Sequence, residues 1–218
     1  MTQFEQLRAR MVDNQLRTSG VTEQSLLAEM AKLPRERFVP PKREAVAYID
    51  DLHWFGDGAG RRFMMPPATL AKLLQLAEIT RDDAVLDVGA ATGYATAVIA
   101  GLARSVVGLE ADAGLAAKAA ATLAELGLTN VSILAGDISA LGSATFDVIF
   151  VQGALDQVPD AMFAALNDGG RLIALIRTAG VSVANVFVKT GGTIAARGEF
   201  NATLPALEQS RREPDFVL

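Results

Sequence analysis

From residue 84 onward, short apolar runs alternate with segments of helical periodicity. The runs are apolar throughout, which is typical of strands buried on both sides of a sheet. Strands that alternate with helices in this way predict a mostly parallel, doubly wound α/β sheet covered on both faces. The expected strands are 84–88, 105–109, 131–135, 146–151 and 171–176, and the expected helices are 92–103, 113–126 and 159–166.

Residues 1–79 have a different texture, and we expect them to form a helical extension to that core. One helix is predicted to follow Thr22, its expected N-cap, and to stop before Pro34. Another is predicted to begin at Pro67, because proline suits the first turn of a helix. Between these helices the chain is rich in proline, glycine and aromatic residues, which favours irregular structure.

After the last predicted parallel strand, segments 183–189 and 193–199 are expected to pair as a hairpin around Gly191–Gly192. A chain of 218 residues can bury one sizeable core. We therefore expect a single domain, in which 1–79 lies on the substrate side and 80–218 is a Rossmann-like ligand-binding core.

The first predicted strand runs into a turn that contains glycine, and a helix follows at once. Gly89 allows the sharp turn, and Gly93 lets the start of the helix lie close to a ligand. Backbone N–H groups at such a helix start attract a carboxylate. The dinucleotide fingerprint requires a second glycine where this chain has Ala91, so NAD fits less well.

Acidic residues end or follow three successive predicted strands, at Asp87, Glu110 and Asp137. Open α/β sheets bind ligands at the carboxyl ends of their strands, so these side chains are expected to line one site. Asp87 suits a ligand that carries an amino group. Glu110 can accept hydrogen bonds from two ribose hydroxyls, and Asp137 can accept one from an adenine amino group.

In these features the chain resembles the class I S-adenosylmethionine-dependent methyltransferases. Segments 146–150 and 166–172 are similar to their fourth strand and to the loop before their fifth. The resemblance implies S-adenosylmethionine as the cofactor. The residues expected to bind it are Asp87, Gly89, Ala91, Gly93, Tyr94, Glu110, Asp137 and Ile138.

The extension resembles one family within that class, the protein-L-isoaspartate O-methyltransferases. Segments 11–16 (MVDNQL), 33–40 (LPRERFVP) and 47–50 (AYID) match that family in order and spacing. The resemblance implies that the chain methylates the α-carboxylate of isoaspartyl residues in damaged proteins. That methylation begins repair through a succinimide.

One segment departs from the family, which carries a Gly-x-Gly-Gln-Thr-Ile-Ser-Gln-Pro-like sequence with hydroxyls that face the substrate. Here 56–66 reads GDGAGRRFMMP, which is two residues longer. Aligned on Pro66, the hydroxyl positions become Arg62 and Met64, which are the candidate catalytic positions. Arg61 or Arg62 could bind a carboxylate through two hydrogen bonds instead.

This change need not abolish methyl transfer. A carboxylate nucleophile with a reference pKa of about 3.5 is ionised at pH 7 and needs no general base. The protein then has to align and desolvate the reactants. A lost hydroxyl removes a bond of about 1.5–3 kcal/mol, which is roughly one to two decades in rate.

The composition argues against several other kinds of site and substrate. The chain has no cysteine and a single histidine, which argues against disulfides, thiolate chemistry and a histidine-based metal site. A net charge of −5 gives no electrostatic footprint for nucleic acid. The sequence shows neither a membrane span nor a signal peptide. We expect a cytoplasmic monomer or homodimer that acts on protein or peptide carboxylates.

Two alternatives stay open at this point. The chain could keep the cofactor site and methylate another acceptor, or it could be a cofactor-binding module without catalysis. A dehydrogenase is a more distant possibility because of the glycine pattern.

Overall fold

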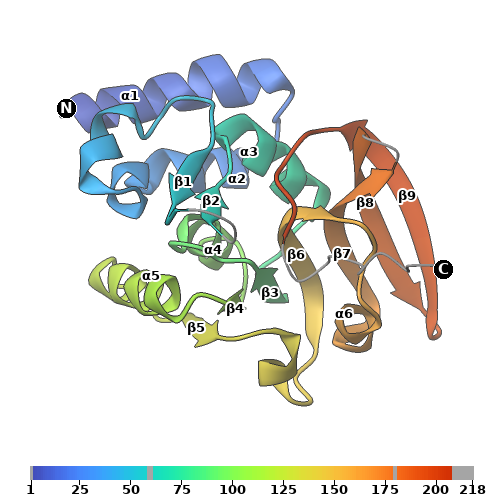
Figure 1. Ribbon diagram of the computed structural model, residues 1–218. Helices are drawn as coiled ribbons and strands as arrows, with labels where there is room; N and C mark the ends of the chain where they lie inside the picture. The colour runs from blue at the N-terminus through green and yellow to red at the C-terminus, as the bar shows by residue number, and fades with distance from the viewer. Residues whose placement is uncertain (1, 58–60, 179–180, 208–218) are drawn as a thin grey trace, which may run out of the picture.

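The computed structural model describes residues 2–57, 61–178 and 181–207. Its main sheet contains the strands β3 (Ala84–Val88), β4 (Ser105–Glu110), β5 (Val131–Ala135), β6 (Phe146–Leu155), β7 (Leu166–Thr178), β8 (Val181–Thr190) and β9 (Thr193–Asn201). They lie in the order β5-β4-β3-β6-β7-β8-β9 (Figure 1). The strands from β5 to β7 are parallel, and β8 runs antiparallel to both of its neighbours. The predicted doubly wound, mostly parallel sheet is therefore confirmed.

Strand β3 lies at the centre of the parallel part. From β3 the chain adds β4 and β5 on one side, then returns to add β6 and β7 on the other side. In sheets of this kind, ligands bind at the carboxyl ends of the strands where the direction of winding reverses. The fold thus brings the ends of β3, β4 and β6 together.

The central strands send apolar side chains into two cores, because successive side chains of a strand face opposite ways. On β3, Val85 enters one core, whereas Leu86 and Val88 enter the other. The first core is the larger, and longer helices cover it. Helix α3 (Pro67–Leu76) ends the extension, and the helices that follow it are α4 (Tyr94–Ala100), α5 (Ala113–Glu125), η5 (Ile138–Leu141) and α6 (Asp160–Ala164).

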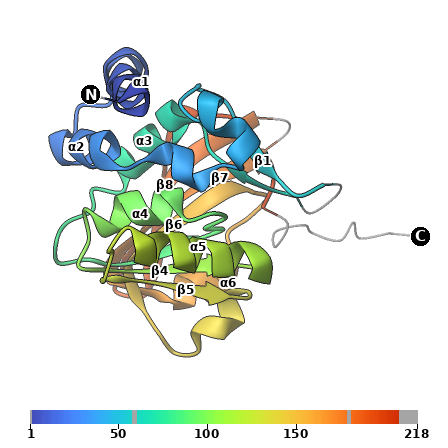
Figure 2. The same ribbon diagram turned by 90° about the vertical axis from the view of Figure 1, so that its left-hand side faces the viewer.

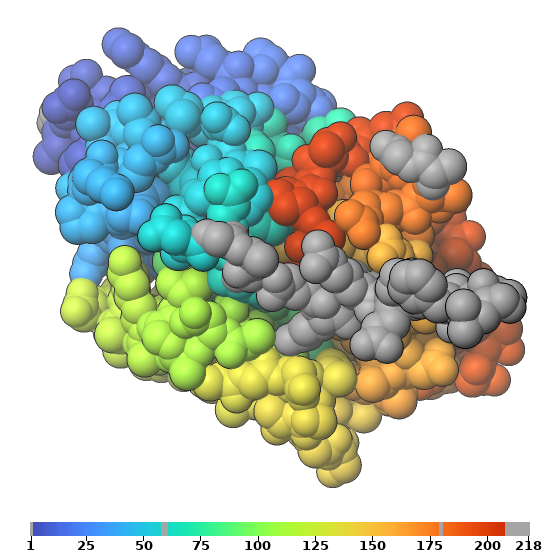
Figure 3. Space-filling model, viewed as in Figure 1, coloured from blue at the N-terminus to red at the C-terminus, as the bar shows by residue number. Residues whose placement is uncertain are grey.

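The extension is largely helical and packs onto the core sheet. Figure 2 shows α1 and α2 together at one end of the molecule, beside α3, and Figure 3 shows the blue and cyan surface of the extension in close contact with the rest. Its elements before α3 are α1 (Gln3–Met11), η1 (Val12–Leu16), η2 (Arg17–Ser19), α2 (Gln24–Lys32), η3 (Arg35–Phe38), η4 (Pro41–Val46), β1 (His53–Phe55) and β2 (Arg62–Met64).

The N-cap of α2 differs from the prediction, because it is Glu23 and not Thr22. The Glu23 carboxylate accepts a hydrogen bond from the Ser25 N–H at 3.1 Å. The Thr22 N–H instead donates to the Gln75 side chain on α3 at 2.7 Å. A contact far along the chain therefore decides where this helix begins.

Other boundaries follow the prediction more closely. Helix α3 begins at Pro67, and α2 ends before Pro34. Helix α4 is shorter than predicted, and β6 and β7 extend beyond their predicted ends. The region expected to be irregular contains an antiparallel pair, β1 with β2, in which Phe55 lies opposite Arg62.

The segment after β9 returns to the carboxyl end of β6, where the red ribbon in Figure 1 meets the sheet. The Ala154 N–H donates to the Pro205 carbonyl, and the Leu207 N–H donates to the Ala154 carbonyl, both at 2.9 Å. The β8–β9 hairpin that precedes it turns at Gly191–Gly192, as predicted, with φ values of 59° and 78°. No helix within the described residues is long and apolar enough to cross a membrane.

Candidate cofactor and acceptor site

The turn after β3 is tied to the end of β4 by backbone hydrogen bonds. The N–H groups of Gly89 and Ala90 donate to the Leu109 carbonyl at 2.8 and 3.1 Å. Gly89 has a φ of 82°, and Ala91 has a φ of 49°, which is uncommon for a residue with a side chain. The Ala91 N–H lies 2.7 Å from Oε2 of Glu110, so this strained turn fixes a donor on that carboxylate.

Glu110 is the last residue of β4, and its side chain is fully buried. Its Oε2 accepts the bond from Ala91, and its Oε1 accepts one from the Asp112 N–H at 3.0 Å. Two backbone donors thus hold the carboxylate at the carboxyl edge of the sheet. This is the place where the sequence predicted a ribose acceptor.

Arg62 of β2 binds the same carboxylate. Its Nη2 lies 3.2 Å from Oε2 of Glu110, and its Nε lies 2.9 Å from Oε1. The neighbouring Arg61 has another partner, because its guanidinium carbon lies 3.7 Å from the centroid of the Trp54 ring. Of the two arginines considered from sequence, Arg62 is therefore the one at the predicted cofactor site.

Side chains from two distant segments cover the glycine turn. A Cβ atom placed on Gly89 would lie 2.9 Å from Cδ1 of Leu207 and 3.2 Å from Nη2 of Arg62. Leu207 belongs to the C-terminal segment and Arg62 to the extension. The predicted cofactor turn, the β1–β2 hairpin of the extension and the segment that ends at Leu207 therefore meet in one small region.

Asp87 lies behind this turn and is fully buried. Its Oδ2 accepts a hydrogen bond from the Thr96 hydroxyl at 2.5 Å, and its Oδ1 accepts one from the Gln152 amide at 2.7 Å. Burial is the main reason that its pKa rises to about 6. Asp87 supports the turn through these contacts, and its binding of the cofactor's amino group stays a prediction.

Sequence reasoning missed Gln152 and Thr96 as partners of Asp87. Gln152 interrupts the apolar run of β6 near its carboxyl end and is almost fully buried. A polar residue at that place in a buried strand is a usable signal, because buried polar groups need partners. Thr96 lies within the apolar α4 segment and offered the same signal.

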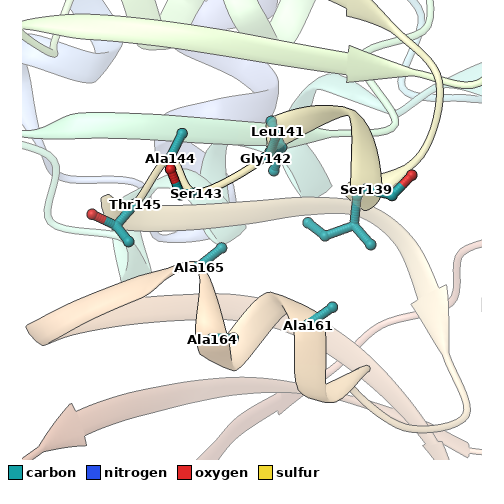
Figure 4. Close-up of a pocket in the computed structure, with 10 residues that line it drawn as sticks. Ser139, Leu141, Gly142, Ser143, Ala144, Thr145, Ala161, Ala164 and Ala165 are labelled. Carbon is teal, nitrogen blue, oxygen red and sulfur yellow. The ribbon is translucent and has the colours of Figure 1, made fainter.

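Asp137 and Ile138 follow β5, next to β4, as expected. Asp137 is exposed, and its Oδ1 accepts bonds from the hydroxyl and the N–H of Ser139, which together lower its pKa. Ile138 lines a pocket of about 360 Å³ between η5 and α6, whose other lining residues are mostly small (Figure 4). Their contact with an adenine ring stays a prediction.

Gly93 and Tyr94 lie at the start of α4, and each packs on a neighbouring element. A Cβ atom on Gly93 would lie 3.2 Å from Cβ of Ala119, so this glycine allows α5 to approach closely. The ring of Tyr94 is buried with the Arg35 guanidinium carbon 4.6 Å from its centroid. Tyr94 therefore joins the core to the 33–40 segment of the extension.

Met64, the second candidate catalytic position, is buried in the larger core with 2% exposure. Opposite it on β1, His53 is also buried, and its pKa falls to about 4, first because of burial and then because of the charges of Arg35 and Arg43. Both side chains contribute to packing here. Residues 58–60 of the same loop lie outside the described residues.

The side chains at the turn fit an S-adenosyl nucleoside. Glu110 offers a fixed carboxylate for a diol, and the buried Thr92 hydroxyl of the same turn has no hydrogen-bond partner within the described part of the chain. Within those ranges no group of three acidic, histidine or cysteine residues could hold a metal ion. A parallel sheet with a glycine turn after its central strand and a buried glutamate at the end of the next strand agrees with the resemblance to the class I methyltransferases.

Comparison with known proteins agrees and is more specific. The family profile of protein-L-isoaspartate(D-aspartate) O-methyltransferase matches residues 7–204. A protein-L-isoaspartate O-methyltransferase from Koribacter versatilis is 37% identical over 196 residues, covering 89% of this chain and 87% of that protein. One from Anaeromyxobacter sp. is 38% identical over 169 residues, covering 76% and 68%. The chain therefore belongs to the protein-L-isoaspartate O-methyltransferase family, and it is an S-adenosylmethionine-dependent methyltransferase.

Solved structures share the fold. A protein-L-isoaspartate O-methyltransferase superposes with a TM-score of 0.80 at 24% identity, covering 92% of this chain and 65% of that one. A putative family member from Plasmodium falciparum, in complex with S-adenosyl-L-homocysteine, gives a TM-score of 0.78 at 20% identity, covering 95% and 99%. At these identities the likeness shows the fold, extension included.

Proposed function

We propose that this chain transfers the methyl group of S-adenosylmethionine to the α-carboxylate of isoaspartyl residues in damaged proteins or peptides. The observation that carries this proposal is the contact between Arg62 and Glu110. Through it, the hairpin of the extension meets the strand end that is expected to bind the cofactor. An acceptor bound against the extension would lie next to that strand end.

The proposed reaction requires no general acid or base from the protein. S-adenosylmethionine, when bound, supplies an electrophilic methyl group. The acceptor carboxylate is already ionised at neutral pH, so the side chains have only to orient it and exclude water. Glu110 would orient the ribose, and Arg62 offers a cation at the acceptor side. The family's hydroxyls are absent, so the arginine takes over the positioning task.

A second candidate is methyl transfer to another acceptor. The burial of Met64 favours it, because this position cannot supply a polar contact to an isoaspartyl group. In either case we propose a protein or peptide acceptor in the cytoplasm and no nucleic-acid substrate, a proposal supported by the net charge of −5. The oligomeric state is proposed as monomer or homodimer.

Two peptides that differ only in an isoaspartyl or a normal aspartyl residue test the proposal. Transfer of labelled methyl from S-adenosylmethionine is expected to the isoaspartyl peptide alone. Transfer to neither peptide, with the cofactor still bound in calorimetry, would refute isoaspartyl specificity. A screen of cell proteins for labelled methyl would then separate another acceptor from a non-catalytic module.

A further inference from the structure

Three hydrogen bonds leave the carboxylate of Glu110 too few free acceptor positions for a diol in the ligand-free chain. An ionised carboxylate offers about four lone-pair sites on its two oxygens. Oε2 is approached by the N–H of Ala91 and by Nη2 of Arg62. Oε1 accepts a hydrogen bond from the N–H of Asp112, and Nε of Arg62 lies 2.9 Å from it as an ion pair without hydrogen-bond geometry. The backbone donors are fixed by the turn and by the start of α5, so only the arginine can leave.

Arg62 and a ribose diol therefore exclude each other at Glu110. A diol that donates two hydrogen bonds needs the position on Oε2 that Nη2 of Arg62 fills and the space beside Oε1 that its Nε occupies. The same guanidinium lies over Gly89, where the cofactor is expected to approach the backbone. Cofactor binding then requires that Arg62 give up its carboxylate partner.

A pocket next to Arg62 can hold its guanidinium after it leaves Glu110. Arg62 lines a pocket of about 400 Å³ between the β1–β2 hairpin and the start of α5. A guanidinium that has lost a buried partner binds another carboxylate strongly, and the N–H donors along its edges allow two parallel hydrogen bonds to it. Asp57 and Asp112 line the same pocket, so a carboxylate of the chain competes with one from an acceptor.

We propose that Arg62 is exchanged between two carboxylates. It occupies Glu110 in the cofactor-free chain, and the ribose releases it to bind the carboxylate of the acceptor. The cofactor consequently binds first and creates the anion site for the acceptor. This inference rests on the proposed function for the identity of the acceptor.

Calorimetry on the cofactor-free protein tests whether Arg62 competes with the cofactor for Glu110. Arg62→Gln removes the competing cation, so S-adenosylhomocysteine should bind about 10-fold more tightly than to the wild type. Arg62→Lys keeps the positive charge but concentrates it on one ammonium group. Its affinity for S-adenosylhomocysteine should lie between those of the wild type and Arg62→Gln. Arg61→Gln is the matched control, because Arg61 stacks on Trp54 and does not touch Glu110, and its affinity for the nucleoside should be unchanged.

Peptide binding tests whether the released Arg62 binds the acceptor carboxylate. The wild type should bind the isoaspartyl peptide at least 10-fold more tightly when S-adenosylhomocysteine is present. Arg62→Gln should show equally weak peptide binding with and without it. At saturating cofactor, the same variant should raise the KM for the peptide more than it lowers kcat. Circular dichroism checks that each variant is folded. If Arg62→Gln does not fold, the same measurements are made on Arg62→Lys.

The outcomes separate this inference from the proposed function. Weaker or unchanged nucleoside binding by Arg62→Gln overturns the exchange, even if the isoaspartyl peptide is methylated. Tighter nucleoside binding without any change in peptide binding overturns the ordered addition and indicates Asp57 or Asp112 as the new partner. If the wild type methylates neither peptide while Arg62→Gln binds the nucleoside more tightly, the proposed function fails and the competition at Glu110 stands.

Discussion

Two buried ionisable side chains have pKa values that move in ways that disfavour their charged forms. Burial raises the pKa of Asp87 to about 6, despite its bonds from Thr96 and Gln152. Burial, with Arg35 and Arg43 nearby, lowers the pKa of His53 to about 4. Desolvation outweighs the hydrogen bonds at Asp87 and acts in the same direction as the arginine charges at His53. Each shift makes folding depend on pH, with opposite sign.

His53 is the single histidine of the chain, so its ring resonances need no assignment. Because the pKa in the folded state is about 4, the Cε1–H resonance should not titrate between pH 8 and 5. The unfolded chain binds this proton near pH 6.5, so His53 lowers stability by up to about 3 kcal/mol as pH falls from 6.5 to 4. A resonance that titrates with a midpoint near 6.5 would show that the ring is exposed to water.

Asp87 has the opposite effect, because its pKa is higher in the folded state than in the unfolded state. The contribution of Asp87 to the free energy of unfolding is fully present below about pH 4 and is lost as pH rises through about 6. Asp87→Asn should therefore stabilise the protein by about 2–3 kcal/mol at pH 7.5, and the gain should vanish toward pH 4. Urea unfolding at both pH values measures this. A variant that is less stable at pH 7.5 contradicts the assignment.

At the scale of elements, the start of α4 depends on its contact with α5. Gly93 has a φ of 88°, and Ala119 and Leu123 lie within 3.3 Å of the position of its missing Cβ. Both the backbone conformation and the close approach favour glycine. The sequence predicted that Gly93 allows a ligand to lie close to the helix start, whereas only the structure shows the left-handed conformation and the approach of α5.

Gly93→Ala should therefore cost more stability than a substitution that strains the backbone alone. Gly127→Ala is the matched control, because Gly127 has a φ of 71° and nothing within 4 Å of a new Cβ. We expect a loss of about 1 kcal/mol for the control and about 2–4 kcal/mol for Gly93→Ala. Thermal and urea unfolding give both values. Equal losses would mean that α5 moves aside without cost.

The β1–β2 pair shows where element prediction fails. Each strand has three residues, too few for a clear alternating pattern. Phe55 and Met64 are nevertheless buried, so the pair forms because the core accepts these side chains. The longer central strands were predicted well, since burial on both faces makes each of them apolar along its length.

At the scale of the whole molecule, the extension and the sheet share one apolar core. Met11 and Leu26 of the extension belong to the same buried cluster as Val85 and Phe150 of the sheet. A core that spans both parts couples their unfolding. This supports the proposal that 1–218 is one domain.

Trp54 makes that proposal testable, because it is the only tryptophan and lies in the extension. Its fluorescence reports the extension, whereas far-ultraviolet circular dichroism reports the helices and strands of both parts. The two probes should give one urea midpoint, and S-adenosylhomocysteine should raise both together. A Trp54 transition at lower urea would show that the extension unfolds separately.

The sequence by itself determined the sheet, the glycine turn and the position of Glu110. Strand periodicity and the turn are local, and parallel strands must end at the same edge. Only the tertiary structure decided which side chains meet there. Arg62 reaches Glu110 across 48 positions, and Gln152 reaches Asp87 across 65. Such contacts depend on how the hairpin and β6 pack, a balance of burial over the whole chain that no local pattern records.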